Sequence, residues 1–563
     1  MRELLHVLNW KAHTFLKNTF TLKGEALSKN VASFLIFGGF AVGVFFLSRT
    51  VTAYLLQQYH IGQFLFHRFL SMVLYVFFIT INLGNMIVSF ATLYKSQEVS
   101  FLMAMPISHA KIFLIKFIDN FFYSSSTLAL VGLAVLLGYG SVFDLPWYFY
   151  FFTIFMVIIP FMLIAGILAV MILMMLIGLA ARIGVRWLLG VIITAYLSAV
   201  YAYFKITNPM QLVHEVMKHY PNVNEYFGYL DPPLVQYLPN HWVTEFLYWS
   251  VNGDYGRAIP YFMLLFLTTV GLIILAGLMA HRYYYKSWLA ASDAQAMQAS
   301  KGRGLRLRFL EFGRQTWLKP QMGALFKRDF WLFLREPSQW LHLMLIFLLM
   351  VIFLLSVSTL ELKLAQPFMQ AVSFIVIFMF DGFLIASITL RFVFPAVSLE
   401  SDCFWAVRSS PLSMKRLYWQ KFFFAFAVVF ASAEFLSVAS IWIVRHDPLL
   451  VRIGAISTAF LVLALTGLNM GAGTYFATFK EKNPIRVASS QGASLTFLAS
   501  MVFLAIVAGV LLIPLHSYFE SVIRDGIVYE SWTYVPLATI ATLSTGIFLL
   551  SSRVGLKSIR RDL

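Results

Sequence analysis

The amino-acid sequence predicts an all-α polytopic membrane protein, with about 12 transmembrane helices in two parallel six-helix repeats. Three observations predict this fold. The 563 residues are 60% hydrophobic and only 12% charged, with a mean hydropathy of +0.79, whereas soluble domains carry about 25% charged residues. Long apolar runs recur along the whole chain. One polar motif occurs once in each half. Lipid must therefore be the solvent for much of this chain.

The apolar runs give the predicted spans, since about 20 mainly apolar residues are needed to cross the hydrocarbon core. The predicted spans are 31–50, 69–93, 113–138, 148–178, 185–205, 259–281, 341–358, 368–392, 422–445, 450–478, 490–514 and 532–553. They divide the chain into a first transmembrane half (1–282), a basic cytoplasmic linker (283–319) and a second transmembrane half (320–563).

The positions of Lys and Arg predict the orientation, because cytoplasmic connections carry an excess of these residues. Cations gather before the first span, in the even-numbered connections and after the last span. The odd connections are poorer: 139–147 contains no Lys or Arg. Both termini are therefore predicted to be cytoplasmic, in a multi-pass protein of the cell membrane. The net charge of +17 then reflects topology and contact with membrane lipid, and we expect no nucleic-acid partner.

A repeated loop follows the second span of each half. The two copies read SQEVSFLMAMPISHAKIFLIKFIDNFF from Ser96 and SDCFWAVRSSPLSMKRLYWQKFFFAF from Ser401. When the prolines are aligned, the matched pairs are Pro106 and Pro411, Ser108 and Ser413, Lys111 and Arg416, and Lys116 and Lys421, with the acidic residues Glu98 and Asp402 upstream. Because each half has an even number of spans, both copies face the cytoplasm.

Local chemistry predicts a short helix in each loop. Ser96 and Ser401 are suitable N-caps. Each proline disfavours α conformation in the preceding residue and so ends its helix, after which Ser108 and Ser413 cap the next span. The cations near that helix N-terminus are disfavoured by the helix dipole. Headgroup phosphates or an acidic protein surface would offset this cost.

This acidic…Pro-[Ile/Leu]-Ser…Lys pattern resembles the loop between spans two and three of ABC-2-type transporter permeases, where a coupling helix docks on an ATPase. The stretch ALFKRDFWLFLREPSQW (324–340) is similar to the amphipathic elbow helix of that family, and a weaker version surrounds Trp10. The stretch YLPNHWVTEFLYWSVNGD (237–254) is similar to the Leu-Pro-x-x-Trp segment that these permeases carry outside the membrane. The whole chain resembles a fused twelve-span ABC exporter permease.

The resemblance implies a transport subunit that is not itself an enzyme. The sequence contains no Gly-Lys dipeptide, so it has no Walker A loop of the form GxxxxGK[ST]. No cofactor is then expected on this chain. ATP and Mg²⁺ would be held by two copies of a P-loop ATPase subunit beneath loops 94–112 and 397–421. The ATPase-coupling residues implied are Glu98, Pro106, Ser108, Lys111, Asp402, Pro411, Ser413 and Arg416.

Other classes stay open at this point. A secondary carrier of the major-facilitator type also has parallel six-helix halves, although its usual Gly-rich loop after span two is missing here. A membrane-embedded enzyme and a non-catalytic membrane scaffold are further alternatives. The transported substrate is unknown from the sequence.

Two carboxylates lie deep inside predicted spans. Asp381 and Glu434 are costly there and indicate an intramembrane functional role, or else a buried structural network near Arg391. Asn82, Asn85 and Asn469 are better explained by hydrogen bonds between helices.

A segment resembling a zinc motif has the wrong spacing. His214 and Glu215, followed by His219, form HExxxH. The five-residue interval puts the histidines about 140° apart on a helix, whereas HExxH puts both on one face.

Overall fold

The structure is a computed structural model that describes residues 25–58, 62–94, 96–183, 185–218, 225–300, 320–335, 346–347, 349–351, 353–354, 367–443, 448–479, 484–488, 490–524 and 531–560. The regular elements in these ranges are all helices, so the predicted all-α class is confirmed. The chain divides into two compact units, unit 1 (Met1–Gly302) and unit 2 (Arg303–Leu563).

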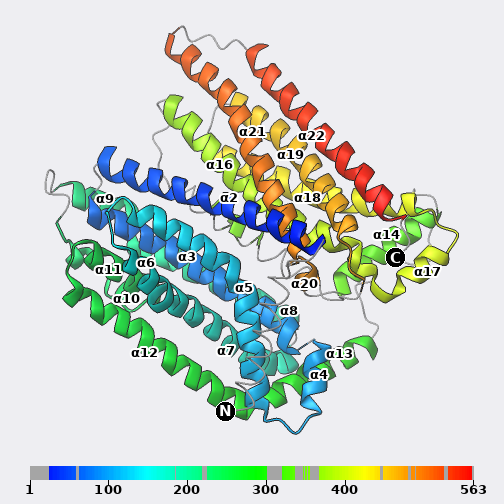
Figure 1. Ribbon diagram of the computed structural model, residues 1–563, viewed down its shortest axis with the longest axis horizontal. Coiled ribbons are helices and arrows are strands. Elements are labelled where there is room, and N and C mark those ends of the chain that lie inside the picture. Colours follow the sequence, from blue (N-terminus) through cyan, green and yellow to red (C-terminus); the bar gives the residue numbers. More distant parts are fainter. Residues whose placement is uncertain are drawn as a thin grey trace. The chain divides into compact units, whose positions relative to one another are not determined.

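Eight helices in the described ranges are long and apolar enough to cross a membrane (Figure 1). They are Gln63–Tyr94, Trp147–Leu179, Tyr255–Ser292, Phe374–Ala396, Met414–Trp442, Pro448–Tyr475, Gln491–Ile513 and Tyr534–Ser558. All eight coincide with predicted spans. The predicted spans 31–50, 113–138 and 185–205 also fall in helices, and 341–358 lies largely outside the described residues. The twelve-span count and the two-repeat arrangement stay predictions.

Unit 1 is built around α3, which packs against α7 and α11, while α2 packs along α5. Its helices are α2 (Glu25–Ala53), α3 (Gln63–Ser89), α4 (Gln97–Met103), α5 (His109–Gly140), α6 (Trp147–Thr153), α7 (Ile159–Ile183), α8 (Val185–Thr207), α9 (Pro209–Met217), α10 (Pro233–Gln236), α11 (Pro239–Val251), α12 (Tyr255–Met279) and α13 (Tyr285–Ser300). Asn82 makes the expected interhelical bonds. Its Nδ2 donates to the Ala165 carbonyl at 2.8 Å, and its Oδ1 accepts from Tyr196.

Unit 2 is built around α19, which packs against α18, α21 and α22. Its elements include α14 (Pro320–Arg335), α16 (Pro367–Ile388), the 3₁₀ helix η9 (Ser398–Cys403), α17 (Phe404–Ser409), α18 (Met414–Ile443), α19 (Pro448–Tyr475), α20 (Pro484–Ala488), α21 (Gln491–Arg524) and α22 (Ser531–Ser558). Small residues let α19 approach α22 closely. A Cβ on Gly471 would lie 2.3 Å from the Ser551 carbonyl oxygen. Such close approach is typical of helix packing in membranes.

Candidate functional site

The two repeated loops have the same backbone turn. In unit 1 the Ile107 N–H donates to the Met105 carbonyl across Pro106 at 2.7 Å, and in unit 2 the Leu412 N–H donates to the Ser410 carbonyl across Pro411, also at 2.7 Å. The first turns of α5 and α18 then repeat the same bonds. The N–H groups of Lys111 and Ile112 donate to the Ser108 carbonyl at 2.9 and 3.2 Å, and the matched groups of Arg416 and Leu417 donate to Ser413 at 2.9 and 3.2 Å. The sequence repeat is thus a repeat of local structure.

The capping predictions have mixed outcomes. Ser96 and Ser108 stand at the N-cap positions of α4 and α5, but neither side chain makes a capping hydrogen bond. The Ser413 hydroxyl does accept from the Arg416 N–H, at 3.4 Å. The prediction that Ser401 begins a helix is wrong, because Ser401 lies inside η9 and α17 begins at Phe404.

A lysine in each copy ties the loop to the following long helix. In unit 1 the ammonium of Lys116, which is buried on α5, pairs with the exposed carboxylate of Glu98 on α4. In unit 2 the matched Lys421 pairs with Glu400 at 2.7 Å. Sequence alignment matched Glu98 with Asp402, whose side chain lies outside the described residues. The other matched cation, Arg416, is exposed and donates to Gln321 on α14 at 3.0 Å.

Unit 2 extends this ion pair into a larger charge network, here called the Arg328 network: Arg328, Asp329, Glu400, Gln420 and Lys421. Arg328 lies 2.6 Å from Glu400 and 2.8 Å from Asp329. Lys421 lies 3.6 Å from Asp329, and Gln420 donates to that carboxylate at 3.1 Å. Burial alone would raise the pKa of Asp329, but Lys421 and Arg328 outweigh it and hold the pKa below its usual value. The network therefore fastens α14, η9 and α18 together.

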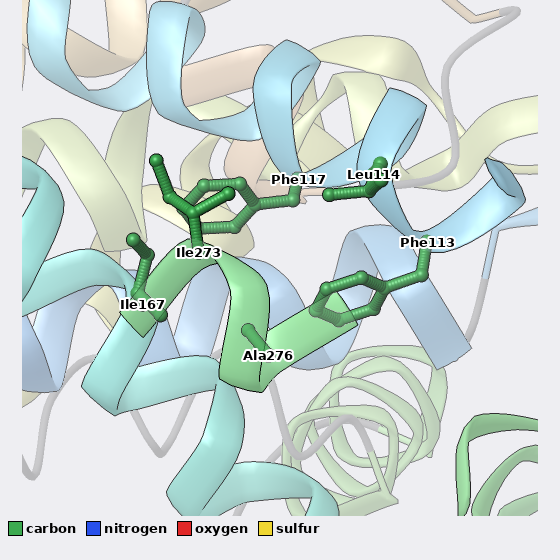
Figure 2. Close-up of a pocket in the computed structure, with 6 residues that line it drawn as sticks. All are labelled: Phe113, Leu114, Phe117, Ile167, Ile273 and Ala276. Carbon is green, nitrogen blue, oxygen red and sulfur yellow. The ribbon is translucent and has the colours of Figure 1, made fainter. Parts of the chain in front are cut away.

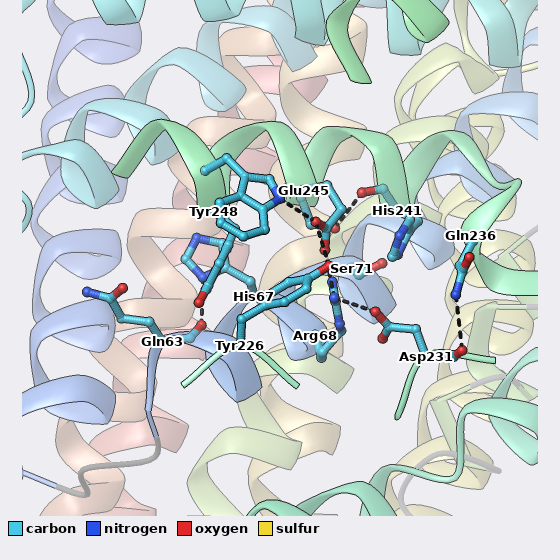
Figure 3. A network of polar contacts seen from close by, with 12 residues as sticks. Gln63, His67, Arg68, Ser71, Tyr226, Asp231, Gln236, His241, Glu245 and Tyr248 are labelled. Carbon is cyan, nitrogen blue, oxygen red and sulfur yellow. Dashed lines mark hydrogen bonds and ion pairs between the residues drawn. The ribbon is translucent and has the colours of Figure 1, made fainter. Parts of the chain in front are cut away.

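Unit 1 carries its densest charge cluster at the opposite end of α3 from its loop. The Arg68 cluster consists of Arg68 on α3, Asp231 before α10, and His241 and Glu245 on α11 (Figure 3). The guanidinium lies 2.5 Å from Asp231 and 2.6 Å from Glu245. All four residues are buried. The second carboxylate oxygen of Glu245 accepts from Trp249 at 2.8 Å and from Tyr226 at 3.1 Å.

Burial shifts the titration of the cluster. It raises the pKa of Asp231 to about 6, against the opposing effect of Arg68. Burial also lowers the pKa of His241 to about 4, with Arg68 adding to the shift, so this imidazole is neutral near pH 7. For Glu245, burial would raise the pKa, but Arg68 outweighs it and the pKa is lowered.

The Leu-Pro-Asn-His-Trp stretch holds this cluster in place. Pro239 occupies the first turn of α11, where its missing N–H costs nothing. Asn240 donates to the Ser71 hydroxyl at 2.9 Å and to Tyr203 at 3.0 Å, and Trp242 donates to the Gln236 carbonyl at 2.8 Å. The stretch thus locks α11 against α3 and α8.

The two predicted intramembrane carboxylates do not come together as an ion-pair network. Asp381 on α16 is 1% exposed and accepts from the Ser440 hydroxyl on α18 at 2.7 Å. Its other oxygen, and one oxygen of Glu434, have no hydrogen-bond partner among the described residues. No ion pair in the described part of the chain joins either carboxylate to Arg391.

Sequence reasoning missed the Arg68 cluster and the acidic members of the Arg328 network. Arg68 stands one residue before a predicted span, and Glu245 lies in the stretch 237–254, which by itself indicates only a family resemblance. The available signal was Glu245, an acidic residue placed among the aromatics of the stretch 237–254.

A family profile described as "Putative ATP-binding cassette" matches residues 26–562. No curated protein and no solved structure matches the chain. The family match contradicts the assignment to the ABC-2-type permeases. The description places an ATP-binding cassette in the family of this chain. It therefore also contradicts the prediction of a transport subunit that is not an enzyme. The prediction that this chain holds no ATP or Mg²⁺, and that a separate subunit holds both, is contradicted as well. That prediction rested on short loop motifs and on the missing Walker A sequence.

The described residues do not fit ATP and Mg²⁺ held in the P-loop manner. A P-loop connects a strand to a helix N-terminus, whereas the described ranges contain no strand and the sequence has no Gly-Lys dipeptide. A cavity among α5, α7 and α12 has a volume of only about 10 Å³ and an apolar lining that includes Phe113, Phe117 and Ile273 (Figure 2). That volume corresponds to about one water molecule.

Proposed function

Because the chain belongs to the family described as "Putative ATP-binding cassette", we propose that it is a membrane-spanning protein of an ATP-driven transport process at the cell membrane. One observation carries the proposal. The matched residues, 26–562, include all eight helices that are long and apolar enough to cross a membrane. The family match and the membrane-crossing helices therefore occupy the same stretch of chain. The helices are not a membrane anchor attached to a separate soluble domain that carries the match.

The two repeated loops are the elements that we propose to move with the transport cycle. Each loop is a short helix, a proline turn and the start of a long helix, and each is fastened to that long helix by a lysine ion pair. In unit 1 a displacement of α4 would pull on α5, because the Glu98–Lys116 ion pair and the turn connect them. In unit 2 the turn connects α17 to α18, and the Glu400–Lys421 ion pair connects η9 to α18. Rigid-body movement of packed helices is an established way of changing access to a path.

In unit 1 a single helix supports transmission from this loop to the Arg68 cluster. Arg68 and Tyr94 belong to one continuous helical segment, Gln63–Tyr94. At 1.5 Å per residue the segment between them spans roughly 40 Å. A displacement of α3 at its loop end would therefore be transmitted to its other end, where α11 packs against α3.

The experiment measures the accessibility of the loops in membrane vesicles that contain the full chain. Ser100→Cys and Ser409→Cys each place a thiol on an exposed position of one loop. Both variants also carry Cys403→Ser, which removes the one cysteine of the sequence. The rate of maleimide labelling is compared in Mg-ATP and in Mg-ADP. Leu234→Cys, on an exposed position before α11, is the matched control.

The proposal expects Mg-ATP to change labelling at both loop positions by more than at Leu234→Cys, which lies three residues from Asp231 of the Arg68 cluster and reports only what α3 transmits. Equal labelling rates in Mg-ATP and Mg-ADP at both loop positions would contradict it.

A further inference from the structure

The Arg68 cluster carries more negative than positive charge. Arg68 supplies one positive charge, while Asp231 and Glu245 supply two negative charges when both are ionised. Their side chains are only 6%, 5% and 0% exposed. An uncompensated buried charge is costly, so the cluster has the electrostatics of a site that takes up a cation.

The possible metal-donor atoms of the Arg68 cluster lie close together. Asp231, His241 and Glu245 each offer one ligand atom, and these three atoms lie within 4.8 Å of one another. Arg68 contacts one oxygen of Asp231, Oδ2, which leaves Oδ1 for another ligand. The ligands come from two separate segments, the turn before α10 and the face of α11 on which His241 and Glu245 are four residues apart.

His241 provides an independent indication of a ligand. The side chain is 3% exposed, and its Nδ1 has no hydrogen-bond partner among the described residues. A buried polar nitrogen normally has a partner. An imidazole nitrogen without a partner, on a side chain whose ligand atom lies within 4.8 Å of those of two carboxylates, is placed as a metal ligand would be.

The surroundings orient the carboxylates as metal sites require. Trp249 and Tyr226 donate to one oxygen of Glu245, and Arg68 holds the other. Ligating carboxylates in metal sites are themselves hydrogen-bonded in this way, and such contacts fix their direction.

We propose that Asp231, His241 and Glu245 bind a divalent first-row transition-metal ion. One imidazole nitrogen with two carboxylates is a donor set for Zn²⁺ or Mn²⁺, whereas Ca²⁺ and Mg²⁺ prefer oxygen ligands alone. The ion fastens the segment before α10 to α11 and, through the carboxylates, to Arg68 on α3. The metal-site proposal does not depend on the transport proposal.

The test uses the purified full chain after removal of metals with a chelator. Co²⁺ is added stepwise and followed by its visible absorption, and Zn²⁺ retention is measured by elemental analysis. The site predicts one saturable equivalent of metal per chain and a Co²⁺ spectrum with nitrogen ligation. His241→Gln and Asp231→Asn should each weaken the affinity tenfold or more. His214→Gln, on the exposed face of α9, should leave it unchanged.

The absence of saturable Co²⁺ and Zn²⁺ binding in the unmodified chain would overturn the proposal without any variant. Unchanged affinity in a folded His241→Gln chain would overturn it as well. A loss in His214→Gln equal to that in His241→Gln would also reject the assignment.

Discussion

The two units share a loop but bury their charges in different places. In unit 1 the loop is tied by Glu98, whose side chain is 46% exposed, and the densest charge cluster lies at the other end of α3. In unit 2 the loop is part of the dense network, because its Glu400 and Lys421 pair with residues on α14, and Glu400, Asp329 and Lys421 are all at most 9% exposed. The two loops thus have similar backbone turns but are held in place by different ion pairs. The comparison indicates a loosely held loop in unit 1 and a firmly held one in unit 2.

The largest expected effect comes from breaking the Arg68 cluster. Arg68→Met removes the only cation that contacts the two buried carboxylates within the described residues, and breaking a buried ion pair costs about 3–5 kcal/mol. The measurement is the free energy of unfolding of the full chain in detergent. The exposed His214→Gln should change it by less than about 0.5 kcal/mol. A loss below about 1 kcal/mol for Arg68→Met would mean that the cluster is not an anchor.

The next comparison is between the two loop carboxylates. Glu400→Gln leaves the partly exposed Arg328 and the buried Lys421 with one acidic partner, Asp329, and we expect the free energy of unfolding to fall by about 3 kcal/mol. Glu98→Gln removes a partly exposed ion pair and leaves Asp119 near Lys116 at 3.8 Å, so we expect at most about 1 kcal/mol. Hydrogen exchange of the two loops in the same variants shows which loop is destabilised. Equal losses of unfolding free energy in Glu400→Gln and Glu98→Gln would contradict the difference between the two loops.

A smaller effect is expected at two matched glycines. Gly166 and Gly471 each follow the proline of their loop by 60 residues. A Cβ on Gly471 would meet the Ser551 backbone, whereas one on Gly166 would meet nothing closer than 3.7 Å. Gly471→Ala should therefore cost about 1–3 kcal/mol through overpacking, while Gly166→Ala should be tolerated. Thermal unfolding of both variants measures the difference, and the reverse order would show that α19 and α22 are not in close contact.

The smallest effect is a pH dependence of the Arg328 network. The folded pKa of Asp329 is lower than its usual value of 3.8, so Asp329 contributes stability above pH 3.8. That contribution is lost as the pH falls through the folded pKa. Thermal unfolding between pH 6 and pH 3 should therefore lose less stability on acidification in Asp329→Asn than in the unmodified chain. Identical pH profiles would contradict the lowered pKa.

Apolar length and local turn chemistry made much of the fold predictable. The run 148–178 coincides closely with the helix Trp147–Leu179, because a helix that crosses a membrane must be long and apolar whatever its partners are. The turns at Pro106 and Pro411 were predictable for a similar reason, since proline restricts its own neighbourhood.

Long-range charge pairing was not predictable in the same way. Arg68 and Glu245 are 177 residues apart, and no local pattern connects them. In unit 2, Glu400 in the 3₁₀ helix before α17 is the acid paired with Lys421 among the described side chains. The side chain of Asp402, the acid that alignment matches with Glu98, lies outside them. The family assignment was wrong because it rested on short loop motifs, whereas the family match covers residues 26–562.

The central claim is that the two loops are equivalent elements on one side of the membrane. A membrane-impermeant maleimide applied to intact and then to permeabilised cells tests it, with Ser100→Cys, Ser409→Cys and Leu234→Cys each in the Cys403→Ser background. The account predicts that both loop positions react only after permeabilisation, while Leu234→Cys reacts in intact cells. Labelling of Ser100→Cys and Ser409→Cys from opposite sides would contradict it.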